Sequence, residues 1–372
     1  MINSKRKIKS ILFFVNDLQY FYSHRFGLAK TCLKNNFRVY VVFGEEGNID
    51  IKKLKINKNL LLINCTFKRN STSILGELGF LIRIFKIFKS LKPDLVHLIN
   101  LKPYLYGGLV CKVLSIPSVT SITGLGFTNK YVYSSRIHKI IILFLLKIIL
   151  NRKNHIIIVQ NKDDKKFLES NLKIKKNKIS TIKGTGINLE KYKFKPLPKL
   201  PYNVVFPGRF IKEKGIIEYI EASKLLQKNK PKINFWIVGE YDEKARSLIK
   251  KEDLEHWERI GLIKLLGFKD NLYEVFSKAH IVCLPSYQEG FPRVLVEAAA
   301  CGRPVITTNV PGCKEAILPN KSGLLANVRD SKDLALKIKK ITANITFIEK
   351  MSKASRLFAE KNFDIYYFNK RH

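Results

Sequence analysis

Short apolar runs alternate with helix-length stretches along most of the chain, and this alternation restricts the fold more than any other feature. Helical patterns such as Arg25–Lys34 and Ile74–Leu91 lie between the runs. Buried strands that alternate with helices indicate a parallel sheet of the doubly wound type. The strands expected in the first half are Ile11–Val15, Val39–Phe43, Leu60–Ile63, Leu95–Leu98, Val119–Ile122 and Ile156–Val159.

The alternation occurs a second time after Tyr192–Tyr202, a segment with three prolines and no periodicity that we expect to be a linker. The strands expected after it are Asn203–Phe206, Asn234–Val238, Ile263–Leu265, Ile281–Leu284 and Pro304–Thr307. The helices expected there are Gly215–Gln227, Leu272–Ser277, Pro292–Ala300 and Ser331–Thr342. We therefore predict an α/β protein with two Rossmann-like doubly wound domains facing a central cleft, which is the default ligand site.

The length of 372 residues suits two domains of ordinary size. We expect the first domain to cover residues 1–195 and the second to cover 196–347. Residues 348–372 have a helical pattern, and the sequence leaves open whether this C-terminal helix crosses back to the first domain.

The chain is strongly basic, with 68 Lys and Arg against 30 acidic residues and a formal net charge of +38. Such a charge favours an anionic partner, which can be nucleic acid, an anionic membrane or a phosphorylated substrate. Part of the excess is expected from an AT-rich genome, since Lys, Ile and Asn are all abundant. The basic residues are spread along the chain and no nucleic-acid-binding module is recognisable, so nucleic acid is not the expected partner.

The six cysteines form no C-x-x-C pair and have no histidine at metal-ligand spacing. We expect free thiols in a reducing cytosol, without disulfides or a bound metal. The apolar run near the start is too short for a secretion signal. Ile140–Leu150 is the best candidate for a membrane span, but Lys147 interrupts it and a span needs roughly 20 apolar residues.

An anion site is predicted where the first expected strand of the second domain ends. Gly208 and Arg209 follow that strand, and Lys214 and Gly215 open the next helix. A helix N-terminus offers free N–H groups and positive partial charge, and the two cations suit a diphosphate. Two solvated surface cations are the alternative.

Two acids with seven residues between them occur in YQEGFPRVLVEAAACGR. Glu289 is expected in a loop, Pro292 at the first position of a helix, and Glu297 inside that helix. Carboxylates accept hydrogen bonds from vicinal hydroxyls, so these two acids suit two hydroxyl pairs. The alternative is a capping acid and an exposed helix acid.

The motifs of the second domain resemble a known family. Glu289–Val305 resembles the E-x7-E signature of retaining glycosyltransferases of family 4, which have the GT-B fold. Gly208–Gly215 resembles the diphosphate-binding element of that family, and Pro311–Leu325 resembles its "GG..E.I..G..G.L" tail. The resemblance covers most of Asn203–Asp333.

The resemblance implies roles for single residues. Arg209 and Lys214 would hold the donor diphosphate and stabilise the leaving nucleoside diphosphate, Glu289 would contact the transferred sugar, and Glu297 would bind the ribose hydroxyls. The expected catalytic residues are therefore Glu289, Arg209 and Lys214. The other donor-binding residues implied are Gly208, Gly290, Phe291 and Pro292. The resemblance implies neither a metal ion nor a cofactor, because the cations and helix dipole do the electrostatic work.

The first domain is similar to glycosyltransferases that extend polyprenyl-diphosphate-linked sugars in the assembly of bacterial capsule, O-antigen and N-glycan. Thr123 stands where many members carry a histidine, which argues against a His-assisted step. A local cap or core contact is the alternative role for His24. The acceptor-binding candidates at or after expected strand ends are Asn16, His24, Arg25, Lys102, Thr123, Gly124 and Gly126.

Ile74–Lys92 combines apolar residues with four regularly placed cations. A basic amphipathic helix of this kind can lie on anionic lipid. The alternative is an ordinary helix packed on the sheet with its cations in water. The cations are Arg83, Lys86, Lys89 and Lys92, and the aromatic residues among them are Phe80, Phe85 and Phe88.

The sequence thus predicts a metal-independent, cytoplasmic retaining glycosyltransferase that is peripheral on the inner face of the cell membrane. Its expected donor is a UDP-hexose or UDP-N-acetylhexosamine, and its expected acceptor is a polyprenyl-diphosphate-linked sugar. The alternatives are a nucleotide-sugar epimerase of the GT-B fold and, in another class, a basic nucleic-acid-binding protein.

Overall fold

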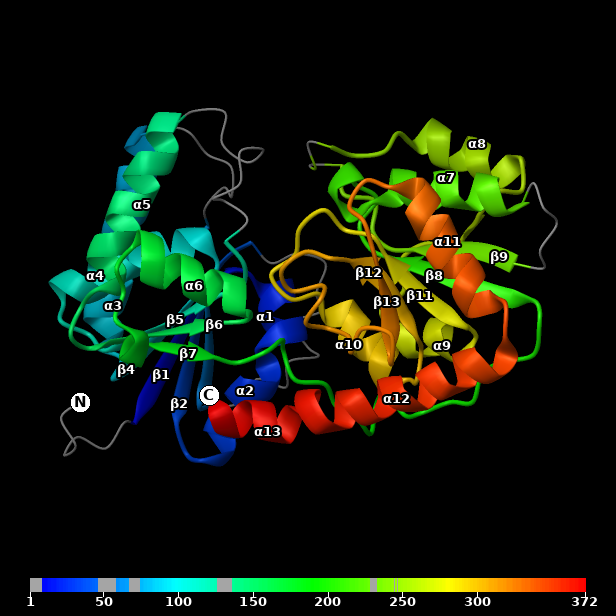
Figure 1. The fold of residues 1–372 in the computed structure, drawn as a ribbon. Coiled ribbons are helices and arrows are strands. Elements are labelled where there is room, and N and C mark those ends of the chain that lie inside the picture. The colour runs from blue at the N-terminus through cyan, green and yellow to red at the C-terminus, as the bar shows by residue number, and fades with distance from the viewer. Residues whose placement is uncertain are drawn as a thin grey trace. The chain divides into compact units, whose positions relative to one another are not determined.

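The computed structural model describes residues 9–45, 58–66, 74–125, 136–227, 233–243, 245 and 247–372, except for the side chains of residues 74 and 136–139. The chain divides into two compact units (Figure 1). The first contains Met1–Ile182 together with Asn369–His372, and the second contains Lys183–Phe368. Among the helices described, none is long and apolar enough to cross a membrane.

The first unit is built on a seven-stranded sheet in the order β3-β2-β1-β4-β5-β6-β7, with every strand pair parallel. The order reverses between β1 and β4, as in the Rossmann topology. The strands are β1 (Ser10–Asp17), β2 (Arg38–Glu45), β3 (Leu60–Asn64), β4 (Leu95–Ile99), β5 (Ser118–Ile122), β6 (His155–Val159) and β7 (Ile179–Thr181).

Helices cover both faces of this sheet (Figure 1). Leu12 and Phe14 of β1 pack against the side that carries α3, α4, α5 and α6, whereas Phe13 and Val15 pack against the side that carries α1 and α2. Both faces are therefore apolar, as expected for a parallel sheet. The helices are α1 (Leu18–His24), α2 (Phe26–Lys34), α3 (Ile74–Leu91), the π-helical η2 (Pro103–Gly107), α4 (Gly108–Val113), α5 (Arg136–Leu150), α6 (Lys162–Asn171) and the 3-10 turn η4 (Lys176–Lys178).

The helix expected at Arg25–Lys34 begins one residue later, and another helix precedes it. Asp17 caps the first of the two, because its carboxylate accepts a hydrogen bond from the backbone N–H of Tyr20 at 2.6 Å. Arg25 separates α1 from α2 with φ −127°. The N-cap at Asp17 therefore starts the helical segment earlier than the apolar pattern indicated.

The second unit repeats the topology with a six-stranded parallel sheet in the order β10-β9-β8-β11-β12-β13. The strands are β8 (Tyr202–Pro207), β9 (Ile233–Val238), β10 (Lys264–Leu265), β11 (Ile281–Leu284), β12 (Val305–Thr308) and β13 (Gly323–Ala326). The helices are the 3-10 turn η5 (Lys212–Lys214), α7 (Ile216–Gln227), α8 (Lys251–Arg259), α9 (Leu272–Ser277), α10 (Arg293–Ala300), α11 (Ser331–Thr342), α12 (Ile345–Phe363) and α13 (Ile365–Arg371). The prediction of two doubly wound parallel sheets is confirmed.

The proline-rich segment Tyr192–Tyr202 belongs to the second unit, and the prediction of a linker there is wrong. Tyr192 lies in the hydrophobic core of that unit. The buried guanidinium of Arg303 donates to the backbone oxygens of Lys195 (2.6 Å) and Pro196 (3.1 Å). These contacts attach the segment to the second sheet, so the units divide after Ile182 rather than after residue 195.

The C-terminal helices start on the second unit. The N–H of Ile187 donates to the carbonyl of Phe363 at the end of α12, and its carbonyl accepts from Ile365 at the start of α13. The side chain of Asn369 donates to the hydroxyl of Thr31 at 3.1 Å. Thr31 lies in α2, so the final residues of the chain belong to the first unit.

Candidate active site

The candidate residues of the second unit lie at the point where its strand order reverses. β8 and β11 are neighbours in the sheet but are not consecutive in the chain. In open α/β sheets, ligands bind outside the carboxyl ends of the strands at such a switch point. Gly208 and Arg209 follow β8, and the loop with Glu289 follows β11. The topology therefore brings both predicted motifs to one edge of the sheet.

Glycines let the backbones approach one another closely at this edge. A Cβ on Gly239 would lie 1.8 Å from the carbonyl oxygen of Gly208. Gly215, which ends η5, has φ +75°, and a Cβ there would lie 2.1 Å from the carbonyl oxygen of Pro285 after β11. Only glycine fits such positions. The turn before α7 thus passes directly over the end of β11.

Lys214 and Glu289 form an ion pair across the switch point. Both side chains are largely buried, and the hydroxyl of Ser286 donates to the same carboxylate oxygen of Glu289 at 2.9 Å. Ser286 is fully buried after β11, and its carbonyl accepts from the hydroxyl of Thr308. The predicted cation and the predicted sugar-binding acid are therefore in direct contact.

Arg209 points toward a different acid. Its guanidinium donates to the carboxylate of Asp242 at 3.1 Å, and both side chains are partly exposed. Asp242 lies in the segment after β9 and was not among the predicted site residues.

The loop that carries Glu289 and Gly290 is supported by the turn at Pro311 and Gly312. Gly312 has φ +79°, and a Cβ there would lie 2.2 Å from the carbonyl oxygen of Gly290. The motif resembling the family tail therefore packs against the motif resembling the E-x7-E signature.

Phe291 and Pro292 shape the start of α10. The ring of Phe291 is 7% exposed, packs on Phe363 at a centroid distance of 5.5 Å, and lies over Gly184. Pro292 is the N-cap with ψ 107°, and the helix begins at Arg293, so its prediction as the first helical residue is off by one. Pro292 stays outside the helix because its ψ is extended. Proline is tolerated both at the N-cap and at the first helical position, because a backbone N–H there has no partner within the helix.

Glu297 lies inside α10 and is 6% exposed. One of its carboxylate oxygens accepts from the hydroxyl of Tyr192 and from Nε of Arg293, both at 2.8 Å. Burial raises the pKa of Tyr192, and the neighbouring Glu297 raises it further. The tyrosine therefore stays a neutral donor that holds the acid. Ribose binding by Glu297 stays a prediction.

In the first unit, Asn16, Asn100 and Thr123 follow or end the adjacent strands β1, β4 and β5. The N–H of Asn16 donates to the side-chain oxygen of Asn100 at 3.4 Å. Asn100 has φ +75° and Gly124 has φ +140°. The side-chain oxygen of Asn16 is buried and, among the described residues, accepts no hydrogen bond. This edge is the switch point of the first sheet. The side-chain oxygen of Asn16 is available there as a hydrogen-bond acceptor for a ligand.

His24 and Arg25 lie at the end of α1. The ring of His24 stacks on Tyr20 at 4.3 Å, and Nδ1 lies 2.6 Å from the hydroxyl of Ser23. Arg25 is 1% exposed, and burial lowers the pKa of its guanidinium. The local contact that was the alternative for His24 is present, and an acceptor role for either residue stays a prediction.

Lys102 is held by an acid that the sequence did not reveal. Its ammonium group lies 2.6 Å from the carboxylate of Glu77 in α3. Burial raises the pKa of Tyr106, which hydrogen-bonds the same acid. The remaining acceptor candidate, Gly126, lies outside the described residues.

Sequence reasoning missed several partners of the predicted residues. Arg293 is four residues before Glu297 on one helix, and this spacing was a usable signal. Ser286 lies three residues before its partner Glu289 in one loop, whereas Tyr192, Asp242 and Glu77 meet their partners only through the tertiary fold. In the described parts of the chain, no cluster of three or more His, Cys, Asp or Glu could hold a metal.

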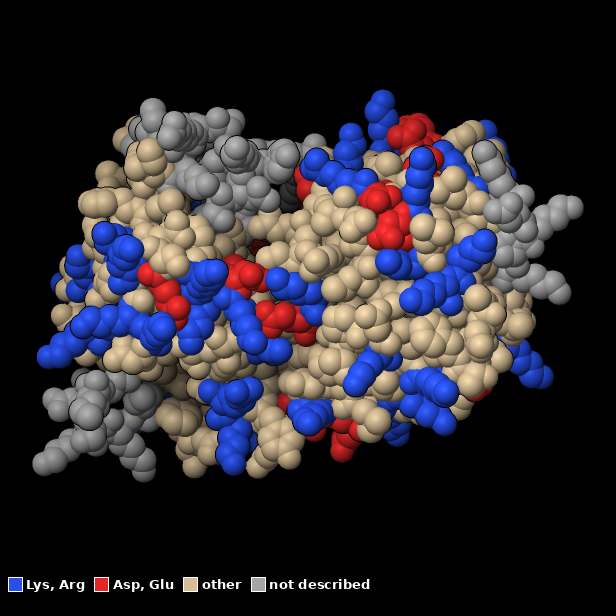
Figure 2. Space-filling view, viewed as in Figure 1, with Lys and Arg blue, Asp and Glu red and all other residues tan. Residues whose placement is uncertain are grey.

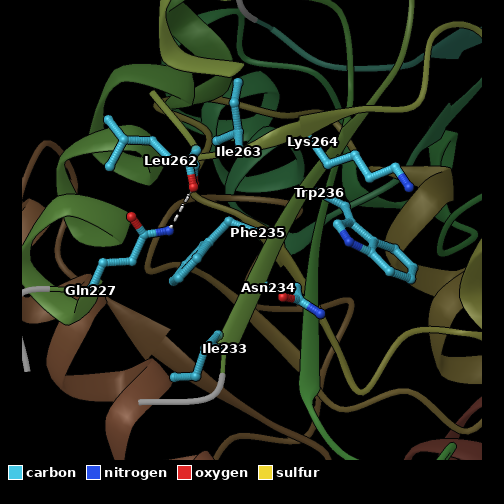
Figure 3. Close-up of a pocket in the computed structure, with 9 residues that line it drawn as sticks. Gln227, Ile233, Asn234, Phe235, Trp236, Leu262, Ile263 and Lys264 are labelled. Carbon is cyan, nitrogen blue, oxygen red and sulfur yellow. Dashed lines mark hydrogen bonds between the residues drawn. The ribbon is translucent and has the colours of Figure 1, made fainter. Parts of the chain in front are cut away.

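The cavity drawn in Figure 3 is separate from this site. It has a volume of about 340 Å³ and is lined by residues of β9, such as Asn234 and Trp236, and by the chain that enters β10. Gln227 donates to the carbonyl of Leu262 at its edge, at 3.2 Å. These residues lie toward the amino ends of the strands, whereas the predicted motifs follow the carboxyl ends.

Two family models match the chain. Residues 189–358 match the model described as glycosyl transferases group 1, and residues 10–161 match the model described as glycosyl transferase 4-like. The matches fall on the second and first units respectively.

Curated relatives and solved structures resemble the chain over most of its length. N,N'-diacetylbacillosaminyl-diphospho-undecaprenol alpha-1,3-N-acetylgalactosaminyltransferase of Campylobacter jejuni is 30% identical over an alignment of 333 residues that covers 85% of each chain. UDP-Gal:alpha-D-GlcNAc-diphosphoundecaprenol alpha-1,3-galactosyltransferase of Escherichia coli is 24% identical over 69% of this chain and 68% of its own. Anabaena HepE in complex with UDP-glucose superposes with a TM-score of 0.78 at 20% identity, covering 97% of each chain. The chain therefore belongs to the group 1, family 4-like glycosyltransferases and is a glycosyltransferase of the GT-B fold.

Proposed function

We propose that the protein is a retaining, metal-independent glycosyltransferase that moves a sugar from a UDP-hexose or UDP-N-acetylhexosamine to a polyprenyl-diphosphate-linked sugar. The acceptor class is supported by the names of the C. jejuni and E. coli relatives, both of which act on sugars linked to undecaprenyl diphosphate. The donor class is supported by the E. coli relative, whose name includes UDP-Gal, and by HepE, which was solved with UDP-glucose.

The contact between Lys214 and Glu289 at the switch point is the observation that carries the proposal. A donor whose diphosphate meets Lys214 has its sugar beside Glu289, because phosphate and sugar are directly bonded. Arg209 supplies a second cation after β8, and the turn into α7 supplies backbone N–H groups. Glu297, buried in α10, is assigned to the ribose.

The chemistry follows from these charges. The bond between the anomeric carbon and the phosphate oxygen breaks, and its electron pair goes to the leaving UDP. Lys214 and Arg209 stabilise this developing negative charge, which is the role that a metal ion has in other enzymes. Glu289 lies on the side of the sugar, where an oxocarbenium-like state develops positive charge. The acceptor hydroxyl then bonds to the face that UDP leaves and gives its proton to the departing phosphate oxygen, which retains the anomeric configuration.

We place the acceptor at the switch-point edge of the first unit, with Asn16, Lys102 and Thr123 as contacts and the protein on the cytoplasmic face of the membrane. The basic helix α3 supports binding to anionic lipid, where each cation near the surface contributes about 1 kcal/mol. The six free cysteines fit a reducing compartment. Nucleic acid is not proposed as a partner, since Lys and Arg are spread over the face drawn in Figure 2.

The test is transfer from a panel of UDP-sugars to an undecaprenyl-diphosphate-linked sugar, with the wild-type chain and Glu289→Gln compared in the presence of a chelator. We expect the wild type to be active with one of the donors, and Glu289→Gln to be slower by roughly 100-fold because a charge that acts on the transition state is lost. In calorimetry Glu289→Gln should bind UDP at least as tightly as the wild type, because the change removes no contact to the nucleotide and releases Lys214 from its acid.

The matched control is Glu274→Gln, which removes an exposed acid of α9 outside the site. It should transfer sugar at the wild-type rate. Epimerised free nucleotide sugar without transfer would replace the proposal by the epimerase alternative, and wild-type turnover of Glu289→Gln would remove this acid from the sugar site.

A further inference from the structure

Glu297 is held by only one of its two carboxylate oxygens. Oε1 accepts from the hydroxyl of Tyr192 and from Nε of Arg293, each at 2.8 Å. Oε2 accepts no hydrogen bond from the described residues, and it is open to solvent although the residue as a whole is 6% exposed. Two donors on one oxygen restrict rotation of the side chain, so the open oxygen is kept in one place and can accept from a ligand.

Glu289, the other acid of the E-x7-E segment, is held in the same way. Its Oε1 accepts from the hydroxyl of Ser286 at 2.9 Å and from the ammonium group of Lys214. Its Oε2 likewise accepts no hydrogen bond within the described parts of the chain. A hydroxyl and a cation thus hold each acid by one oxygen. This repetition indicates that the hydroxyl donor serves the acid rather than the hydrophobic core.

Ring packing and a backbone contact hold Tyr192 itself in place. The residue is 4% exposed, and its ring meets the ring of Tyr273 edge-on at a centroid distance of 6.4 Å. One guanidinium nitrogen of Arg356 in α12 donates to the carbonyls of Tyr192 and Ala300, both at 2.7 Å. Ala300 is the last residue of α10, and α12 packs against this helix (Figure 1). Arg356 therefore ties the backbone of Tyr192 to the helix that carries Glu297.

The hydroxyl of Tyr192 acts as a hydrogen-bond donor and not as a base. Burial raises the pKa of Tyr192, and Glu297 raises it further, so the phenol keeps its proton at neutral pH. Among the described residues, Glu297 is the one hydrogen-bond partner of this hydroxyl. A phenylalanine would fill the same place in the core. Removing the hydroxyl therefore acts on the placement of the acid.

We propose that Tyr192 is a positioning residue that makes the protein select a ribonucleotide: it aims the open oxygen of Glu297 at the ribose hydroxyls of the donor. An acceptor that is already fixed gains more from these hydroxyls, because the ligand does not have to order the side chain. A nucleotide without the hydroxyls leaves the carboxylate unpaired and binds more weakly. The inference rests on the proposed function for the placement of the ribose at Glu297.

The experiment is titration calorimetry of the full chain with UDP and with 2′,3′-dideoxy-UDP. We expect wild type to bind UDP at least about tenfold more tightly than the dideoxy nucleotide. Tyr192→Phe should bind UDP about three- to tenfold more weakly than wild type does, and the dideoxy nucleotide with unchanged affinity. A purely structural role of the hydroxyl would weaken the binding of both nucleotides by the same factor, or of neither, and either result would overturn the inference.

The matched control is Tyr219→Phe. Tyr219 is fully buried in α7, and its hydroxyl donates to the carbonyls of Val204 and Trp236 at 2.8 and 3.0 Å. This variant also loses a buried phenol hydroxyl in the second unit, but that hydroxyl does not contact Glu297. It should keep the wild-type preference for UDP over the dideoxy nucleotide. Cooperative unfolding in guanidinium checks that both tyrosine variants are folded.

Combined substitutions test whether Tyr192 acts through Glu297. Glu297→Ala should lose the preference for UDP, and adding Tyr192→Phe to it should change neither affinity, because no acid is left to position. If Glu297→Ala loses the preference but Tyr192→Phe keeps it, the inference is wrong and the proposed function stands. If wild type binds UDP no better than the dideoxy nucleotide, or does not bind UDP, both the inference and the assignment of Glu297 to the ribose are wrong.

Discussion

At the scale of single residues, the cations of the candidate site are already occupied by acids. Lys214 is paired with Glu289, and Arg209 is paired with Asp242. Only one of these two acids has a proposed role toward the donor. Asp242 follows β9 and occupies Arg209 where the donor phosphate is expected, so we infer that it competes with the donor.

Replacing Asp242 by Asn should therefore strengthen UDP binding. The pair with Arg209 is partly exposed, and such pairs contribute about 0.2–1 kcal/mol, so we expect affinity to rise by roughly 1.4- to fivefold. Titration calorimetry with UDP measures the change. Asp253→Asn, at an exposed acid of α8, is the control and should leave the affinity unchanged. Weaker binding by Asp242→Asn would show that this acid helps to hold the nucleotide.

The sequence indicated which motifs meet at the switch point of the second sheet, but it did not indicate the partners of their side chains. The spacing of Glu289 and Glu297 and the turn at Gly208 are local features, and the topology places them at one sheet edge. Tyr192 and Glu297 are 105 residues apart, so no local pattern relates them. Partners of this kind depend on how loops from different strands meet, and the spacing of residues along the sequence does not specify this.

At the scale of elements, the longer strands and amphipathic helices were predictable, whereas several short or polar elements were missed. The apolar runs of β1, β2 and β4 are buried on both faces and stand out from their surroundings. β7 has three residues at a sheet edge, and α8 (KEDLEHWER) buries little beyond Leu254. Such elements are stabilised by contacts with neighbouring elements, and their own sequences show little hydrophobic periodicity.

The glycine turn beneath the Glu289 loop can be tested by Gly312→Ala. Alanine at φ +79° costs about 1–2 kcal/mol, and its Cβ would also meet the carbonyl of Gly290 at 2.2 Å. We expect the free energy of unfolding, measured with guanidinium, to fall by about 2–4 kcal/mol and sugar transfer to be lost. Gly267→Ala has φ +66° with no described atom within 4 Å of the added Cβ, so it should cost only about 1–2 kcal/mol. Equal costs would mean that the turn and the loop move apart freely.

At the scale of the whole molecule, each unit has its own hydrophobic core. The clusters of the first unit and the main cluster of the second share no residue. The proposed donor contacts, from Gly208 to Glu297, all lie in the second unit. Thermodynamic linkage therefore predicts that UDP stabilises one part of the molecule and not the other.

Scanning calorimetry of the full chain tests this division. We expect two unfolding transitions. The transition whose midpoint temperature UDP raises should be the one whose midpoint a core substitution in the second unit lowers. Ile306→Val in β12 and Ile157→Val in β6 are matched probes, because both side chains are fully buried in parallel strands and each change costs about 0.5–1.5 kcal/mol. Ile306→Val should lower the midpoint temperature of the UDP-sensitive transition, and Ile157→Val should lower the midpoint of the other transition. If UDP raised the transition that Ile157→Val lowers, the nucleotide would bind the first unit, and the assignment of the donor site to Lys214 and Glu289 would be wrong.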